Sequence, residues 1–129
     1  MAFNLGKSIV LAVATILPVL SVGVVEAVAD NYGAIARSRD SGDKGYAWNF
    51  QSRQEAERRA RQECRSISGS GDCRALLWFK NACGSIAEAS NGGAGTGWGT
   101  DEELAERYAI SSCRTVGSRC RVVRTFCTN

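Results

Sequence analysis

Six cysteines are the residues of this chain whose type and spacing most directly permit chemistry. Cysteines in proteins form disulfides or hold metal ions, and a structural zinc site normally uses closely spaced cysteine pairs, often with histidine. The 129-residue chain has no histidine, and no two of its cysteines are separated by only two residues. We therefore expect disulfides and predict neither a metal nor a cofactor. The cysteines are Cys64, Cys73, Cys83, Cys113, Cys120 and Cys127.

Acid–base and nucleophilic catalysis have few candidates. The absence of histidine removes the commonest general base near neutral pH. Carboxylates remain, and paired carboxylates hydrolyse glycosides. However, acidic residues in these polar segments are also typical of turns and helix starts. We predict no catalytic residues and keep a small Asp- or Glu-dependent hydrolase as an alternative. Its candidate residues are Asp40, Asp43, Asp101, Glu102 and Glu103.

Arginines and tryptophans are the side chains that could bind a partner. Exposed tryptophans beside arginines stack on sugars or bases, and a basic set binds phosphates or an acidic protein surface. The plainer interpretation places the tryptophans in a core layer beneath the helices and the arginines along a solvated sheet edge. The candidate partner surface consists of Arg65, Arg74, Arg114, Arg119, Arg121, Arg124, Trp48 and Trp98.

The first 29 residues have the composition of a secretory signal peptide. Lys7 precedes an almost wholly apolar run over residues 9–25, and residues 27–29 present small side chains at the positions that signal peptidase reads. Pro18 interrupts the run and no basic cluster follows it, which argues against a permanent membrane anchor. We expect cleavage after Ala29 and export of residues 30–129 as a single domain, to the periplasm or outside the cell.

The second half of this domain repeats the first. Alanine, alanine and cysteine at four-residue spacing end at Cys64, and the same pattern ends at Cys113, at a constant offset of 49 residues. A fixed internal period is typical of two copies of one structural unit. We expect units at residues 32–80 and 83–127, each in the order strand, strand, helix, strand.

The repeat also narrows the cysteine pairing. In each unit one cysteine ends the predicted helix and another begins the following strand, so these two should bond within the unit. The two cysteines without repeat equivalents are left for each other. The expected disulfides are Cys64–Cys73, Cys113–Cys120 and Cys83–Cys127.

Local signals place the two helices. Ser52, followed by Glu55, forms a capping box that predicts a helix to about Cys64. The second helix should begin at Thr100 or Asp101. Its inward-facing residues should be Leu104, Ala105, Tyr108, Ala109 and Ser112.

The strand patterns predict an α+β fold. Residues 73–79 are nearly all apolar, which is typical of a central strand that is covered on both faces. We expect two β-β-α-β units that share one sheet of about six strands, with both helices on one face and disulfide staples. The other face would stay solvated or contact a partner.

Five short motifs resemble the bacterial family called domain of unknown function 4189. They are YGAIA, GYAWNF, a helix that ends in cysteine, CRALLWFKNACGSIA and CRVVRTFC, in this order, over nearly all of residues 32–127. The resemblance implies an exported or periplasmic single-domain protein. It carries no shared activity and no catalytic residues.

Export, cross-links and the missing catalytic set predict a non-catalytic binding module. We expect its partner to be a protein or an envelope component, as for a periplasmic inhibitor, an immunity-type module or an envelope accessory protein. The other alternative is a secreted effector or virulence factor that acts on host cells. A net charge of +3 is too small to favour nucleic acid. Signal cleavage would leave no membrane anchor, and the oligomeric state is left open.

Overall fold

The computed structural model describes residues 12–16, 18, 23 and 29–128. The predicted signal peptide, residues 1–29, lies largely outside these residues. Within the described ranges, no helix is both long and apolar enough to cross a membrane.

The described part of the domain contains eight elements, four in each half, and the order strand, strand, helix, strand is the same in both halves. The first half contains β1 (Tyr32–Ser38), β2 (Lys44–Phe50), α1 (Arg53–Ser68) and β3 (Cys73–Lys80). The second half contains β4 (Cys83–Glu88), β5 (Ala94–Gly99), α2 (Glu102–Arg114) and β6 (Arg121–Cys127).

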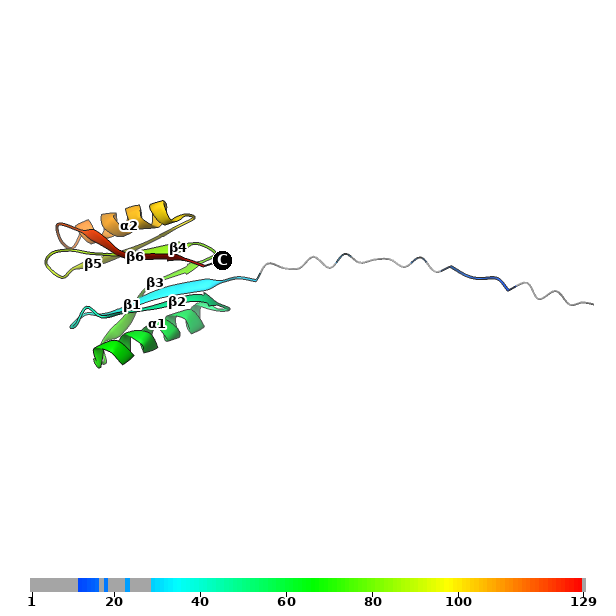
Figure 1. Ribbon diagram of the computed structural model, residues 1–129, viewed down its shortest axis with the longest axis horizontal. Coiled ribbons are helices and arrows are strands. Elements are labelled where there is room, and N and C mark those ends of the chain that lie inside the picture. Colours follow the sequence, from blue (N-terminus) through cyan, green and yellow to red (C-terminus); the bar gives the residue numbers. More distant parts are fainter. Residues whose placement is uncertain (1–11, 17, 19–22, 24–28, 129) are drawn as a thin grey trace, which may run out of the picture.

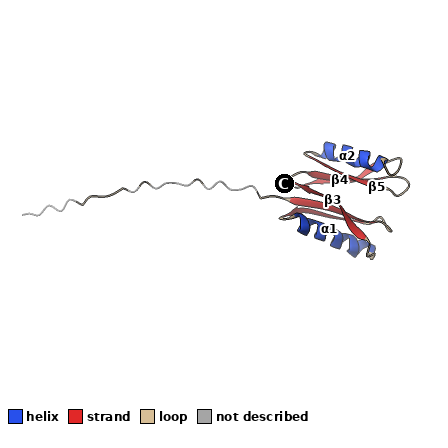
Figure 2. Cartoon of the chain, turned by 180° about the vertical axis from the view of Figure 1, so that it is seen from behind, coloured by secondary structure: helices blue, strands red, loops and turns tan. Residues whose placement is uncertain are grey.

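The strands form two antiparallel sheets of three strands each, in the orders β2-β1-β3 and β5-β4-β6. The expected single sheet of about six strands, with both helices on one face, is therefore wrong. Figure 1 shows four layers, in which α1 and α2 cover opposite outer sides of the two packed sheets, and Figure 2 shows the same layers from behind. The reason is that each sheet is apolar on both faces, so the face without a helix is buried against the other sheet.

The core between the sheets contains the larger apolar side chains. Ile35 and Ile86, from the two central strands, are fully buried, and Phe79 is nearly so. The rings of Phe79 and Phe126 lie 5.2 Å apart, between centroids, in an edge-to-face arrangement. Burial of each such side chain contributes roughly 1.5–3 kcal/mol to folding. This layer joins the two halves into one domain.

The two outer layers are built from small residues. Each helix buries two alanines and a cysteine against its sheet. A Cβ atom on Gly45 would lie 1.9 Å from the carbonyl oxygen of Ala60, and one on Gly95 would lie 2.1 Å from the backbone nitrogen of Cys113. Both helices therefore lie directly on the backbone of the strand beneath them. The buried helix residues are Ala56, Ala60, Cys64, Ala105, Ala109 and Cys113.

Both helix starts are confirmed at their capping residues. The Ser52 hydroxyl accepts a hydrogen bond from the Glu55 N–H at 3.2 Å, and the Asp101 carboxylate accepts one from the Leu104 N–H at 2.8 Å. The first helix continues beyond the predicted Cys64 to Ser68. It ends at Gly69, which adopts the left-handed conformation (φ 63°) that glycine tolerates best.

Strand β3 is an edge strand, so the prediction of a central position is wrong. The central strands are β1 and β4. Leu77 and Phe79 of β3 point into the core between the sheets, whereas Leu76 and Trp78 are exposed. The apolar run of β3 thus reflects one buried face and one apolar surface.

All three predicted disulfides are present and confirmed, and no described cysteine is free. Cys83 and Cys127 are register partners on β4 and β6. The other two bonds each join the end of a helix to the residues that begin the next strand. Three disulfides in so small a domain are typical of proteins from an oxidising, exported environment.

An ion-pair network also joins the two halves. The Glu88 carboxylate of β4 contacts Arg37 of β1 at 3.1 Å and Lys44 of β2 at 2.5 Å. Burial alone would raise the pKa of Glu88, but the hydrogen bonds from Lys44 and Arg37 outweigh it and hold the pKa below its ordinary value.

Candidate functional site

An apolar groove of about 650 Å³, which we call the β5 groove, runs along the outer edge of β5. Its helix side is formed by Leu104, Tyr108 and neighbouring hydroxyl-bearing residues of α2, and its strand side by Thr96 and Trp98. Leu77 of β3 lines its far side. None of the residues that line it is charged. On a domain with a charged surface, such a hollow is a candidate binding site.

The alternation of side chains along β5 positions the strand side of this groove. Gly95 and Gly97 face α2, where a Cβ atom would collide with the helix backbone. Thr96 and Trp98 therefore face the other sheet, because successive side chains of a strand point to opposite faces. The Trp98 side chain is 55% exposed, so the prediction of a tryptophan core layer beneath the helices is wrong.

The second helix contributes side chains that the sequence placed in the core. Tyr108 is 54% exposed and Ser112 is exposed, whereas both were expected to face inward. Only Ala105, Ala109 and Cys113 are buried, as in α1, because a helix lying this close to a sheet covers a narrow face. The apolar face of α2 is wider than that of α1. This difference in the sequence could have identified Tyr108 as a residue outside the helix–sheet contact.

The apolar surface continues from the β5 groove across the edge of β3. A second hollow of about 400 Å³ is lined by Leu76, Leu77, Trp78, Trp98 and neighbouring residues of β3. Sequence reasoning did not select the leucines or Trp78 as contact residues. Their exposure follows from the edge position of β3, which no local pattern indicated.

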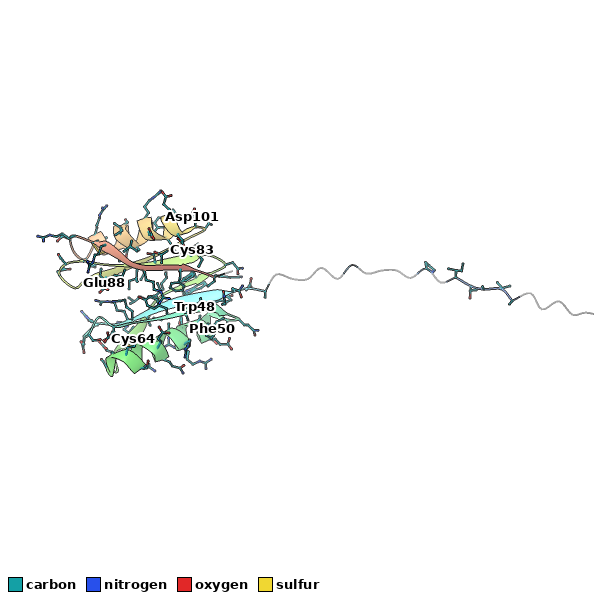
Figure 3. All side chains as sticks on the ribbon, viewed as in Figure 1. Trp48, Phe50, Cys64, Cys83, Glu88 and Asp101 are labelled. Atoms are coloured by element: carbon teal, nitrogen blue, oxygen red, sulfur yellow. A yellow bond between two sulfur atoms is a disulfide. The ribbon has the colours of Figure 1, made fainter. Side chains whose placement is uncertain are left out.

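A different arrangement occupies the opposite edge of the sandwich, where β2 meets β6. The Arg124 guanidinium lies 4.2 Å from the ring centroid of Tyr46 and 5.6 Å from those of Trp48 and Phe126. Figure 3 labels Trp48 next to the strands of the first sheet, on the side that faces the second sheet. The Trp48 side chain is 47% exposed and packs on Phe126, at 6.0 Å between ring centroids. Here an arginine of the chain itself covers the aromatic rings.

Four of the arginines selected from the sequence line three different hollows. Arg119 and Arg121 line a hollow together with Glu88, and Arg74 lines another beside Arg37 and Arg39. The structure brings together Trp48 with Arg124, and Arg119 with Arg121. Elsewhere, Arg114 lines a hollow with Glu106, and Arg65 is exposed near the end of α1.

None of the carboxylates selected from the sequence lines the β5 groove. Asp101 caps α2, and Glu103 pairs with Arg107 on the exposed side of the same helix at 3.1 Å. Asp40 contributes its backbone N–H to the carboxylate of Asp72. Among the described residues, no three His, Cys, Asp or Glu side chains are grouped so that they could hold a metal ion.

Residues 32–127 match the family model described as "Domain of unknown function (DUF4189)". A search of curated proteins found no match at a significant level. Among solved structures, the chain is similar to one described as the NMR structure of Rv1813c from Mycobacterium tuberculosis, with 22% sequence identity and a TM-score of 0.55. The similarity covers 98% of this chain and 97% of that one. At this identity the likeness concerns the fold alone.

Proposed function

We propose, for a chain that belongs to the family of domain of unknown function 4189, an exported module that binds another macromolecule and does no chemistry of its own. The family is described as one of unknown function, so the proposal rests on the surface of the domain. One observation supports it most: an uncharged groove with two aromatic side chains, each more than half exposed, on a cross-linked domain. Aromatic side chains with an exposed face are the usual anchors of binding sites.

Rigidity supports the same function. Three disulfides hold the framework around the groove, and Cys113–Cys120 fixes the end of α2, the helix that forms one wall. A preformed site loses little conformational entropy on binding. An inhibitor, an immunity-type module or an envelope accessory protein would each benefit from such a site.

The proposal is tested by capture of partners on the immobilised, oxidised protein. We expect a partner from a cell-envelope extract to be retained by the wild type and lost by Trp98→Ala and by Tyr108→Ala. Trp48→Ala is the matched control, because Trp48 is a similarly exposed tryptophan at the opposite edge. Equal losses with Trp48→Ala and Trp98→Ala would contradict a specific role for the β5 groove.

The hydrolase alternative has its own test. Turnover of an envelope polymer that is abolished by one acidic substitution, such as Asp43→Asn, would replace binding with catalysis as the function. Fractionation of the source organism separates a periplasmic module from a secreted effector.

A further inference from the structure

The free edge of β5 presents unpaired backbone groups, and two of the residues that carry them, Thr96 and Trp98, line the β5 groove. The Ala89 N–H donates a hydrogen bond to the Gly93 carbonyl at 2.8 Å. In this register, Gly95 and Gly97 of β5 therefore exchange hydrogen bonds with β4. Because these positions alternate along an antiparallel pair, the N–H and C=O groups of Ala94, Thr96 and Trp98 point away from β4. No backbone–backbone hydrogen bond outside the sheets joins these groups to another described residue.

The equivalent edge in the first half has one N–H capped by a helix side chain. The Tyr46 N–H on the free edge of β2 donates a hydrogen bond to the Glu63 carboxylate of α1, at 3.3 Å. Tyr46 occupies the place in β2 that Thr96 occupies in β5, since Gly45 and Gly95 precede them beneath the two helices. A capped edge does not offer its N–H to another chain.

The helices beside the two edges also differ in the residues that they place there. Ala60 and Ala109 are buried at equivalent places, 49 residues apart. At that same offset, Leu104, Tyr108 and Ser112 of α2 stand where α1 carries Glu55, Arg59 and Glu63. One edge is thus flanked by charges and a capping carboxylate, and the other by apolar and hydroxyl groups.

We propose that the free edge of β5 binds an extended, uncharged polypeptide segment of a partner protein as an added antiparallel or parallel strand. The segment's side chains would alternate between Leu104 and Tyr108 on the helix side and Leu77 and Trp98 on the strand side. The open donors and acceptors at strand spacing select a polypeptide backbone. The uncharged lining selects apolar or hydroxyl side chains, because a charged group would lose its hydration there without a partner.

This inference rests on the proposed binding function and names the class of partner. Its probe is an array of uncharged eight-residue peptides with alternating apolar and hydroxyl residues, tested against the oxidised full-length protein. For the peptides that bind, we expect the amides of Thr96 and Trp98 to become protected from hydrogen exchange. We also expect that N-methylation of alternate peptide nitrogens, in the register that pairs with β5, weakens binding at least tenfold, because it removes the donors but keeps the side chains.

A substitution that copies the first half provides the second arm. Ser112→Glu places a carboxylate where Glu63 stands in α1, so it should cap the β5 edge and weaken peptide binding at least tenfold. Ser66→Glu, at an exposed residue near the end of α1, is the control for the added charge and should bind as the wild type does. The free energy of unfolding of both variants, measured in urea, shows whether each is folded.

Each other result overturns the inference. Binding that is insensitive to N-methylation would show that the groove takes side chains and adds no strand. A dimer joined through β5 in the absence of peptide would make a second copy the occupant. Failure of every peptide, while Trp98→Ala still abolishes partner capture, would refute strand addition and leave the binding function standing. If Trp98→Ala keeps both peptide binding and partner capture, the assignment of the binding function to the β5 groove is refuted.

Discussion

Asp72 has a pKa that its hydrogen bonds shift strongly. Its carboxylate accepts hydrogen bonds from the Ser38 hydroxyl at 2.6 Å, from the Asp40 N–H at 2.9 Å and from the Ser70 hydroxyl. These hydrogen bonds, with that of Ser38 the largest, lower the pKa of Asp72 to about 2. Asp72 thereby ties the turn after β1 to the start of β3 while it remains at the surface.

The pKa of Asp72 predicts a dependence of stability on acid. Because the pKa in the folded protein lies below the ordinary value of 3.8, the carboxylate's contribution is complete above about pH 4 and is lost as the pH falls through about 2. Asp72→Asn should lower the urea midpoint at pH 6, and the gap to the wild type should narrow towards pH 2. Glu103→Gln is the control for loss of one exposed carboxylate. A difference in urea midpoint that stays constant with pH would contradict a stabilising role for the Asp72 charge.

At the scale of elements, the contact between each helix and its sheet depends on the absence of side chains. Gly95 and Gly97 of β5 lie under α2, and the nearest helix atoms are backbone atoms that cannot move aside independently. Because of this close approach, Tyr108 lies at the margin of the contact between α2 and the sheet, where it lines the β5 groove. The packing of β5 therefore determines where the groove lies.

Gly95→Ala should destabilise the protein by about 3 kcal/mol, because its Cβ atom would meet the Cys113 backbone nitrogen at 2.1 Å. The helix would have to move away from the sheet, which would open the core beneath Ala109. Gly71→Ala is the matched control, since no atom lies within 4 Å of its added Cβ, and it should change stability by less than about 0.5 kcal/mol. Urea unfolding measures both, and equal effects would refute the close contact.

At the scale of the whole molecule, two similar halves are held together by the layer between their sheets. Ile35, Phe79 and Ile86 form its centre, and Glu88 bridges the two halves at its side. Cys83–Cys127 adds a covalent tie within the second sheet between residues separated by 44 positions. Figure 3 labels Cys83 in that sheet and Cys64 beside α1, on the other side of the domain.

The disulfides should contribute unequally. Loop-closure entropy predicts that loss of Cys83–Cys127, in the double Cys→Ser variant, costs about 4 kcal/mol, against about 2.5 kcal/mol for Cys113–Cys120. The reason is that a longer closed loop restricts the unfolded chain more. Guanidinium unfolding of the two double variants checks the order. A larger loss for the Cys113 and Cys120 variant would show that strain or local structure outweighs loop length.

Local sequence patterns determined the elements and the cross-links of this protein. Ser52 and Asp101 cap the helices from adjacent positions, and the spacing of the cysteines within the repeat was enough to pair them. Such signals act over a few residues or through a direct comparison of the two halves. For the same reason, five motifs were enough to indicate the family.

Only the tertiary structure decided that the strands form two sheets and that the tryptophans lie at the surface. Pairing between strands distant in sequence is not written in any local pattern, and a strand with two apolar faces fits a central position and an edge position equally well. Burial of both inner faces required the second sheet, which made β3 and β5 edges. The β5 groove exists because of that choice, so its residues could be identified only after the sheets were in place.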